Sequence, residues 1–144
     1  AQDMASRGIL MDIGHGSASF NFETARASMA DGLKPFSIST DLHLHSLEDP
    51  VRDLATTMSK LYGVGLSFED CIEAVCAGPR GVLGLSGRGG LAAGTRADFT
   101  VFDFAEASLP VLDSQGNSMT LERLFEPRMT VIGNDVQPAA RRAS

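Results

Sequence analysis

The pattern of the chain changes near residue 86, and this change limits the possible folds more than any other feature. Before it, short apolar runs that suit buried strands alternate with segments of helical periodicity. After it, the sequence is rich in glycine and in β-forming residues. We therefore expect an α/β unit over residues 1–85, a small β-rich unit over 86–136 and a disordered tail over 137–144.

The first unit begins with a strand, a helix and a second strand. Residues 7–14 form an apolar run before a Gly-His-Gly turn, which is typical of a buried strand. A helix follows, with Asn21 or Thr24 as its N-cap, and a second strand over residues 36–40 ends at Asp41.

Two further helices and a hairpin complete the predicted elements. Apolar residues at three-to-four spacing predict a helix over residues 51–62. Ser67 starts the next helix, which should end before Gly78. Beyond residue 86 we expect a strand over 99–104, two strands joined at residues 115–117, and a last strand near 129–136.

Charge and hydropathy exclude several classes of partner. Twelve basic and eighteen acidic residues give a net charge of −6, which argues against nucleic acid and anionic membranes as partners. No apolar stretch approaches the roughly 18 residues of a membrane span. The chain starts without methionine and without a signal pattern, so we expect it to be the interior of a longer protein.

The two cysteines are expected to be free thiols. Cys71 and Cys76 lie five residues apart in a predicted helix, which separates them by about 7.5 Å of rise and turns them to different faces. That separation excludes a disulfide within an intact helix. We interpret both as small buried apolar residues, and we expect a cytoplasmic protein.

Five residues with metal-binding or acid-base chemistry follow the two predicted strands. His15, His43, His45, Asp12 and Asp41 lie close together in the sequence, and ligands collect at the carboxyl ends of parallel strands. His43 and His45 would point the same way if their segment is extended. Each residue alone also fits an ordinary surface or core role.

Three phrases of the sequence together resemble the closing part of the amidohydrolase superfamily. They are MDIGHGSASF, FETARASMADGLKPFSISTDLH and GRGGLAAGTRADFTVFD, and the resemblance covers about residues 7–133. It is strongest to dihydroorotase-related deacetylases and adenine deaminase-like proteins. The resemblance implies the last two βα units of a (β/α)8 TIM-type barrel plus the C-terminal part of a small β-sandwich. A whole barrel needs about 250 residues, so the other six units would lie elsewhere.

The resemblance also implies roles for individual residues. Asp41 matches the aspartate after the eighth strand, which ligates a metal and takes and returns the proton of the attacking water. His15 falls after the seventh strand, where substrate contact or loop support is implied. His43 takes a supporting or substrate-binding role, whereas His45 has no counterpart and Asp12 serves structure.

A second alignment with the same superfamily is also possible for one motif. TDLHLH resembles the D-x-H-x-H that follows the first barrel strand, which would make His43 and His45 metal ligands. The sandwich phrase follows within about 45 residues, whereas a first strand precedes some two hundred barrel residues. The flanks therefore favour the eighth strand.

The resemblance implies part of a metal-dependent hydrolase that cleaves amide or other C–N bonds of a small-molecule substrate. The expected cofactor is one or two divalent metal ions, with zinc as the expected metal and most ligands outside this chain. Lys34 and Lys60 do not suit the carboxylated bridging lysine of two-metal members. We expect the isolated chain to be inactive and to need the missing N-terminal barrel portion; homo-oligomers are also allowed.

Two alternatives remain open at this point. The chain could be a truncated or split, non-catalytic module that docks on a partner supplying the rest of the barrel. It could also be an independent small metal-binding domain that uses His15, His43 and His45.

Overall fold

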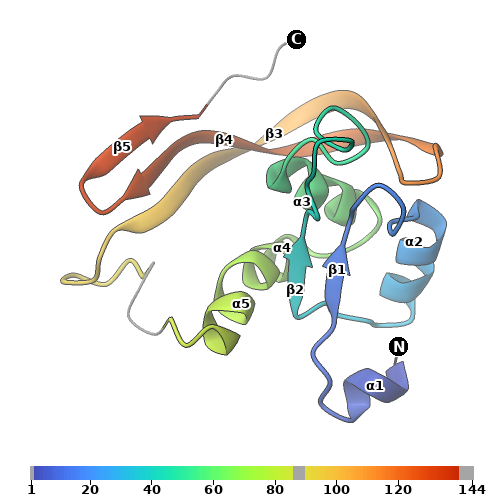
Figure 1. Ribbon diagram of the computed structural model, residues 1–144, viewed down its shortest axis with the longest axis horizontal. Helices are drawn as coiled ribbons and strands as arrows, with labels where there is room; N and C mark the ends of the chain where they lie inside the picture. The colour runs from blue at the N-terminus through green and yellow to red at the C-terminus, as the bar shows by residue number, and fades with distance from the viewer. Residues whose placement is uncertain (1, 86–89, 140–144) are drawn as a thin grey trace.

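The computed structural model describes residues 2–85 and 90–139 and shows an α/β protein with two sheets (Figure 1). A parallel pair joins β1 (Asp12–Gly14) to β2 (Ser37–Ser39). A separate antiparallel sheet has the order β3-β4-β5. The predicted change of pattern at residue 86 falls at residues 86–89, which lie outside the described part.

Five helices accompany the sheets in the described residues: α1 (Gln2–Ser6), α2 (Phe22–Ala30), α3 (Leu54–Gly63), α4 (Phe68–Val75) and α5 (Ala77–Val82). β1, α2 and β2 form one βαβ unit, as the sequence predicts. The Asn21 side chain accepts a hydrogen bond from the Thr24 amide at 2.9 Å, which confirms Asn21 as the N-cap.

The first strand is shorter than predicted. Only Asp12–Gly14 of the apolar run over residues 7–14 pairs with another strand, because β2 itself is three residues long. The Asp12 carboxylate accepts hydrogen bonds from the Ser37 and Ser39 hydroxyls at 2.5 and 2.6 Å across this pair. Asp12 therefore has the structural role that the sequence analysis expected.

The helix that carries the cysteines ends earlier than predicted. Ser67 caps α4, as expected, but α4 stops at Val75 and α5 includes Gly78 and Pro79. A proline in the first turn of a helix is tolerated because its missing N–H has no intrahelical partner there. Cys76 is therefore an exposed residue at the junction, not a buried mid-helix residue, whereas Cys71 is fully buried.

The second unit is a long hairpin with a short third strand. β3 (Asp98–Leu112) and β4 (Ser118–Ile132) pair through two irregularities and turn at residues 113–117, close to the predicted turn. β5 (Asp135–Pro138) follows a Gly-Asn turn. Because β5 pairs with β4, ordered structure extends two residues beyond the predicted start of the tail; residues 140–144 lie outside the described part.

The hairpin and the α/β unit share one hydrophobic core. The long hairpin runs across the molecule with α3 packed against it (Figure 1). Phe125 of β4 is 1% exposed, stacks on Phe68 of α4 at 5.5 Å between ring centroids, and meets Tyr62 of α3 edge-on at 6.5 Å. Its amide donates to the Ser59 hydroxyl at 3.0 Å. The two units therefore fold against each other.

None of the helices in the described part of the chain has the length and hydrophobicity needed to cross a membrane.

Replacing Phe125 with alanine should destabilise both units together. Removing a fully buried aromatic ring costs about 3–5 kcal/mol, and Phe125 touches both parts of the core. Urea unfolding should show one transition shifted by this amount. Phe99→Ala, at a position that is 37% exposed, is the control and should cost much less. Two separate transitions in the wild-type protein would contradict the shared core.

Candidate functional site

The carboxyl ends of β1 and β2 meet at one edge of the parallel sheet. Both strands run the same way (Figure 1), and two backbone hydrogen bonds join the segments just past their ends. The His15 amide donates to the Ser39 carbonyl at 3.2 Å, and the Gly16 amide donates to the Thr40 carbonyl at 3.0 Å. The loop after β1 is thereby held next to Asp41.

Asp41 is an exposed carboxylate on a strained backbone. Its φ of 47° lies in the left-handed region, which an aspartate adopts at a cost. Within residues 2–85 and 90–139, its carboxylate makes no hydrogen bond or ion pair. A carboxylate held in this way is open to a ligand.

Gly16 allows the loop after β1 to approach this carboxylate closely. Its φ is +53°, and a Cβ built on it would lie 2.6 Å from Asp41 Oδ2. Any side chain at this position would overlap the carboxylate. The sequence contains the Gly-His-Gly turn, but only the structure shows that its second glycine faces Asp41.

His15 is fully buried, and it contacts Lys60, a buried lysine that the sequence analysis considered only as a bridging metal ligand and rejected. His15 Nε2 lies 2.9 Å from Lys60 Nζ, and His15 Nδ1 lies 2.9 Å from the Gly16 carbonyl oxygen. Lys60 of α3 is 0% exposed, and its ammonium also donates to the carbonyls of Pro50 and Leu112. These contacts favour loop support for His15; its predicted contact with substrate stays a prediction.

Lys60 gave no signal in the sequence because lysines on helices usually face solvent. In α3, however, every residue from Thr56 to Leu61 is buried, so this part of the helix has no solvent-facing side. A single lysine in a stretch of helix that is otherwise free of charge is the one signal in the sequence that could have suggested a buried lysine with hydrogen-bond partners. Its partners come from segments distant in the sequence.

The contacts define the charges of this pair at neutral pH. Burial lowers the pKa of Lys60 to about 8, and the negative charge of Asp49 opposes this shift. Burial also lowers the pKa of His15 to about 4, and the positive charge of Lys60 adds to the effect. Lys60 is therefore mainly protonated and His15 neutral, with the proton of His15 on Nδ1 because a carbonyl oxygen only accepts.

His43 and His45 are exposed and do not form the extended pair that the sequence suggested. Residues 44–50 are turns, and His43 Nδ1 accepts a hydrogen bond from the His45 amide at 3.3 Å. The two rings lie edge to face, 6.0 Å apart. Because His15 faces Lys60 inside the protein, the three histidines do not converge, which contradicts the independent metal site.

The described residues contain no group of three or more His, Cys, Asp or Glu side chains that could hold a metal ion. Within this part of the chain, Asp41 is therefore not a member of a complete metal site.

The hairpin turn supports the same loop from the other side. The Ser114 hydroxyl donates to the Gly16 carbonyl at 3.1 Å, and the Ser114 amide donates to the Phe20 carbonyl at 2.9 Å. The buried Asp113 carboxylate accepts hydrogen bonds from the amides of Phe22 and Asn117. Burial raises the pKa of Asp113, but these hydrogen bonds outweigh burial and lower it below its usual value.

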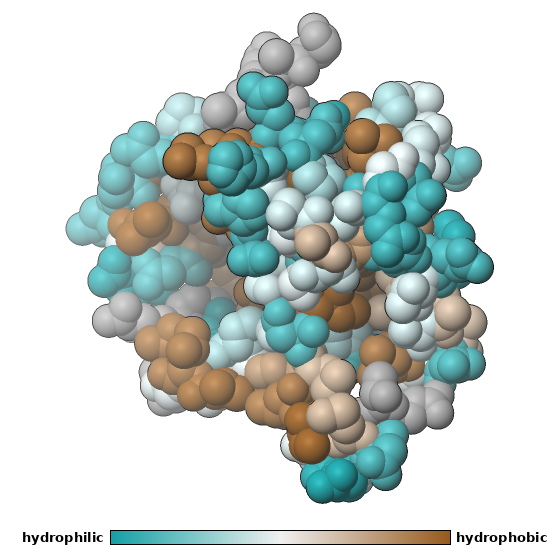
Figure 2. All heavy atoms as spheres, turned by 45° about the vertical axis from the view of Figure 1, so that its right-hand side comes forward, coloured by the Kyte–Doolittle hydropathy of each residue, from teal (hydrophilic) through white to brown (hydrophobic). Residues whose placement is uncertain are grey.

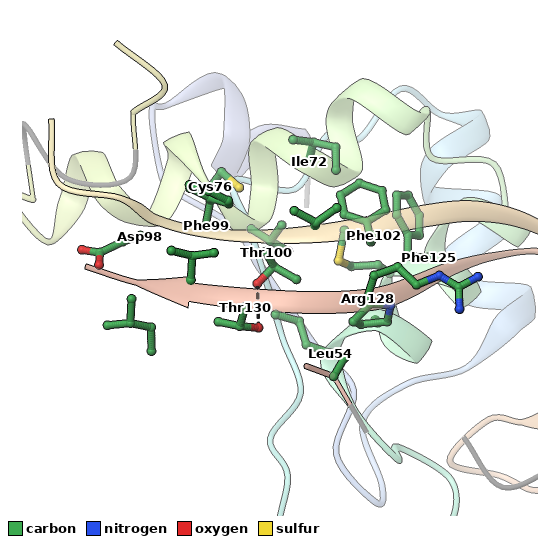
Figure 3. Close-up of a pocket in the computed structure, with 18 of the residues that line it drawn as sticks. Leu54, Ile72, Cys76, Asp98, Phe99, Thr100, Phe102, Phe125, Arg128 and Thr130 are labelled. Atoms are coloured by element: carbon green, nitrogen blue, oxygen red, sulfur yellow. Dashed lines mark hydrogen bonds between the residues drawn. The ribbon is translucent and has the colours of Figure 1, made fainter. Parts of the chain in front are cut away.

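A large groove lies away from these residues. It measures about 1430 Å³ and runs between α4, α5 and the antiparallel sheet, where Ile72, Phe99 and Phe102 line it (Figure 3). Large apolar residues such as Leu83 and Leu91 are exposed, and Figure 2 shows hydrophobic patches on one face. The lining of the groove includes neither Asp41 nor any histidine. We therefore interpret the groove as an unpartnered apolar surface.

The low pKa of His15 predicts that the protein becomes more stable as the pH rises from about 4 to 6.5. In this window the unfolded imidazole binds a proton and the folded one does not, so the contribution of His15 is complete above 6.5 and lost toward 4. One proton gives a slope of at most about 1.4 kcal/mol per pH unit. Urea unfolding of His15→Asn across this range should show a flatter dependence than wild type; parallel curves would refute the shift.

Replacing Gly16 with alanine should cost more stability than the same change at Gly84. Both positions have positive φ, +53° and +63°, so both variants pay about 1–2 kcal/mol for the left-handed backbone. Only at Gly16 does the new Cβ overlap the Asp41 carboxylate; at Gly84 nothing lies within 4 Å. The free energies of unfolding, measured in urea, should differ accordingly, and equal losses would show that the close approach is absent.

Comparison with known proteins points to one family. A deacetylase of Agrobacterium fabrum is 54% identical over 141 residues, and a deacetylase of Brucella anthropi is 53% identical over the same length. Each match covers 98% of this chain but 35% of the relative, so the chain spans about a third of the length of these proteins.

Solved structures agree with this similarity. A crystal structure of a dihydroorotase superposes with a TM-score of 0.92 at 53% identity, covering 99% of this chain and 38% of that one. A crystal structure of an adenine deaminase gives a TM-score of 0.90 at 36% identity, covering 96% of this chain and 38% of that one. The sequence model of the amidohydrolase family matches residues 15–136. The chain belongs to the amidohydrolase family.

Proposed function

We propose that this chain is the C-terminal part of a metal-dependent hydrolase that cleaves an amide C–N bond of a small molecule, with an N-acyl substrate as in a deacetylase. The observation that carries the proposal is Asp41, an exposed carboxylate at the carboxyl ends of two parallel strands, which has no partner among the residues that the structure describes. The two deacetylases that are more than 50% identical support the substrate class. This similarity covers about a third of the length of each deacetylase.

Asp41 is suited to be one of several ligands of a divalent metal ion. We propose zinc as this ion. A carboxylate is a suitable ligand for such ions. The Asp41 carboxylate has no hydrogen-bond or ion-pair partner among the described residues. The other ligands would come from parts of the protein outside this chain. When bound, such an ion polarises a carbonyl and lowers the pKa of a water molecule.

Asp41 would also move the proton that the reaction requires. Its carboxylate accepts a proton from the attacking water as the new C–O bond forms. It then returns this proton to the amine nitrogen as the C–N bond breaks. His43 lies two residues further along the exposed loop, and we propose that it contacts the substrate or supports this loop.

The remaining barrel would complete this part of the protein. We propose that β1 and β2, with the helices that follow them, are the last two βα units of a (β/α)8 barrel, and that the hairpin belongs to a small β-sandwich. In the described residues each strand of the parallel pair has one edge without a partner, and the groove beside α5 is apolar. Both features are expected at surfaces where further polypeptide packs. Because the rest of the barrel would be missing, we propose that the isolated chain is inactive.

The compartment that we propose is the cytoplasm. Cys71 and Cys76 are both free, which suits a reducing environment.

Replacing Asp41 with asparagine in the full-length protein should abolish hydrolysis of an N-acetylated amine. Asparagine keeps the shape but cannot accept the proton, so we expect kcat to fall by at least about a hundredfold. The control is Glu122→Gln, the same exchange at an exposed position of β4, which should keep wild-type activity. Released acetate is the measured product. A fully active D41N protein that remains folded would remove Asp41 from the mechanism.

A further inference from the structure

The Lys60 ammonium has all of its hydrogen-bonding capacity satisfied inside the protein. An ammonium group has three protons to donate, and Lys60 Nζ finds three acceptors: His15 Nε2 at 2.9 Å, the Leu112 carbonyl oxygen at 2.7 Å, and the Pro50 carbonyl oxygen. Burying a charge costs several kcal/mol unless such partners are present. A side chain that only had to fill this space would not need a charge.

The three acceptors belong to three different segments around the candidate site. Pro50 lies in the connection after β2, Leu112 ends β3, and His15 lies in the loop after β1. The parallel ladder between β1 and β2 is only three residues long. Lys60 therefore adds contacts where the sheet provides few, and it fixes the loop after β1 relative to α3.

A chain of contacts leads from Lys60 to Asp41 through the loop after β1. His15 Nδ1 donates to the Gly16 carbonyl, and the Gly16 amide donates to the Thr40 carbonyl, directly before Asp41. Gly16 also lies against the Asp41 carboxylate, where a Cβ would come within 2.6 Å of Oδ2. The position of Asp41 thus depends on the position of residues 15 and 16.

We propose that Lys60 and His15 are positioning residues, which hold the loop after β1 so that Gly16 sets the orientation of the Asp41 carboxylate. The inference rests on the proposed function insofar as Asp41 reacts with substrate. Its geometric part, the dependence of the loop and Asp41 on Lys60, does not require any activity. Groups that orient a ligand side chain in this way affect activity or metal affinity by about 10–100-fold when removed.

The experiment uses the full-length protein with three variants and a matched control. Lys60→Met removes the three donors while keeping the length of the side chain, and His15→Phe removes both ring nitrogens. His15→Gln keeps an acceptor for Lys60 and is the conservative variant. The control is Lys34→Met, which changes the chain's other lysine; this side chain is 74% exposed and pairs with Asp70.

Steady-state kinetics and hydrogen exchange are measured on each folded variant. We expect kcat to fall about 10–100-fold in K60M and H15F while KM changes less than about threefold, because substrate still binds but the carboxylate is misplaced. H15Q should recover much of the loss in H15F. In K60M, the His15 and Gly16 amides should exchange about tenfold faster, because their bonds to Ser39 and Thr40 open more often. K34M should match wild type in every measurement.

The result that overturns the proposal is wild-type exchange at His15 and Gly16 in K60M, or wild-type kcat in both K60M and H15F. If K60M does not fold, the test becomes a comparison of kcat between H15F and H15Q. Equal kcat values in these two variants would refute a role for the Lys60 contact. A wild-type protein without hydrolase activity would instead refute the proposed function. The exchange measurement would still test the positioning of the loop.

Discussion

The structure around the candidate site depends on a buried cation, the Lys60 ammonium. A cation without contact to water is tolerated only where acceptors surround it, and here they come from α3's neighbours on three sides. Because each acceptor is on a different segment, the loop after β1, the connection after β2 and the end of β3 have to meet at one point. Burial lowers the pKa of His15 to about 4 and keeps it neutral, and the contact with Lys60 adds to this effect, since a protonated imidazole could not accept from Lys60.

The hairpin is part of the candidate site although it carries none of the chemistry. Its turn holds the loop after β1 through Ser114, and the buried carboxylate of Asp113 binds the start of α2. Leu112 provides one of the acceptors of Lys60. The core around Phe125 is shared with the α/β unit, so the β-rich unit packs against the strand ends and supports them.

The candidate site and the large apolar groove differ in their chemistry. Asp41 is a single carboxylate on a strained backbone at the strand ends, the type of residue that completes a metal site assembled from several segments. The groove beside α5 contains apolar side chains and none of the candidate residues. Cavity size alone would direct attention to the groove, whereas backbone strain and a carboxylate without a partner in the described residues direct it to the strand ends.

The sequence by itself determined the local features of this protein: the N-cap Ser67, a second N-cap at Asn21 or Thr24, the hairpin turn, and the place of Asp41 after a strand. These depend on residues a few positions apart, so local patterns report them. Tertiary structure alone decided that Lys60 is buried against His15, that Gly16 faces Asp41, and that the histidines do not converge. Each of these involves segments about 25 to 45 residues apart. The hydrogen-bond partner of a buried polar group is a property of the packed chain, which no local pattern encodes.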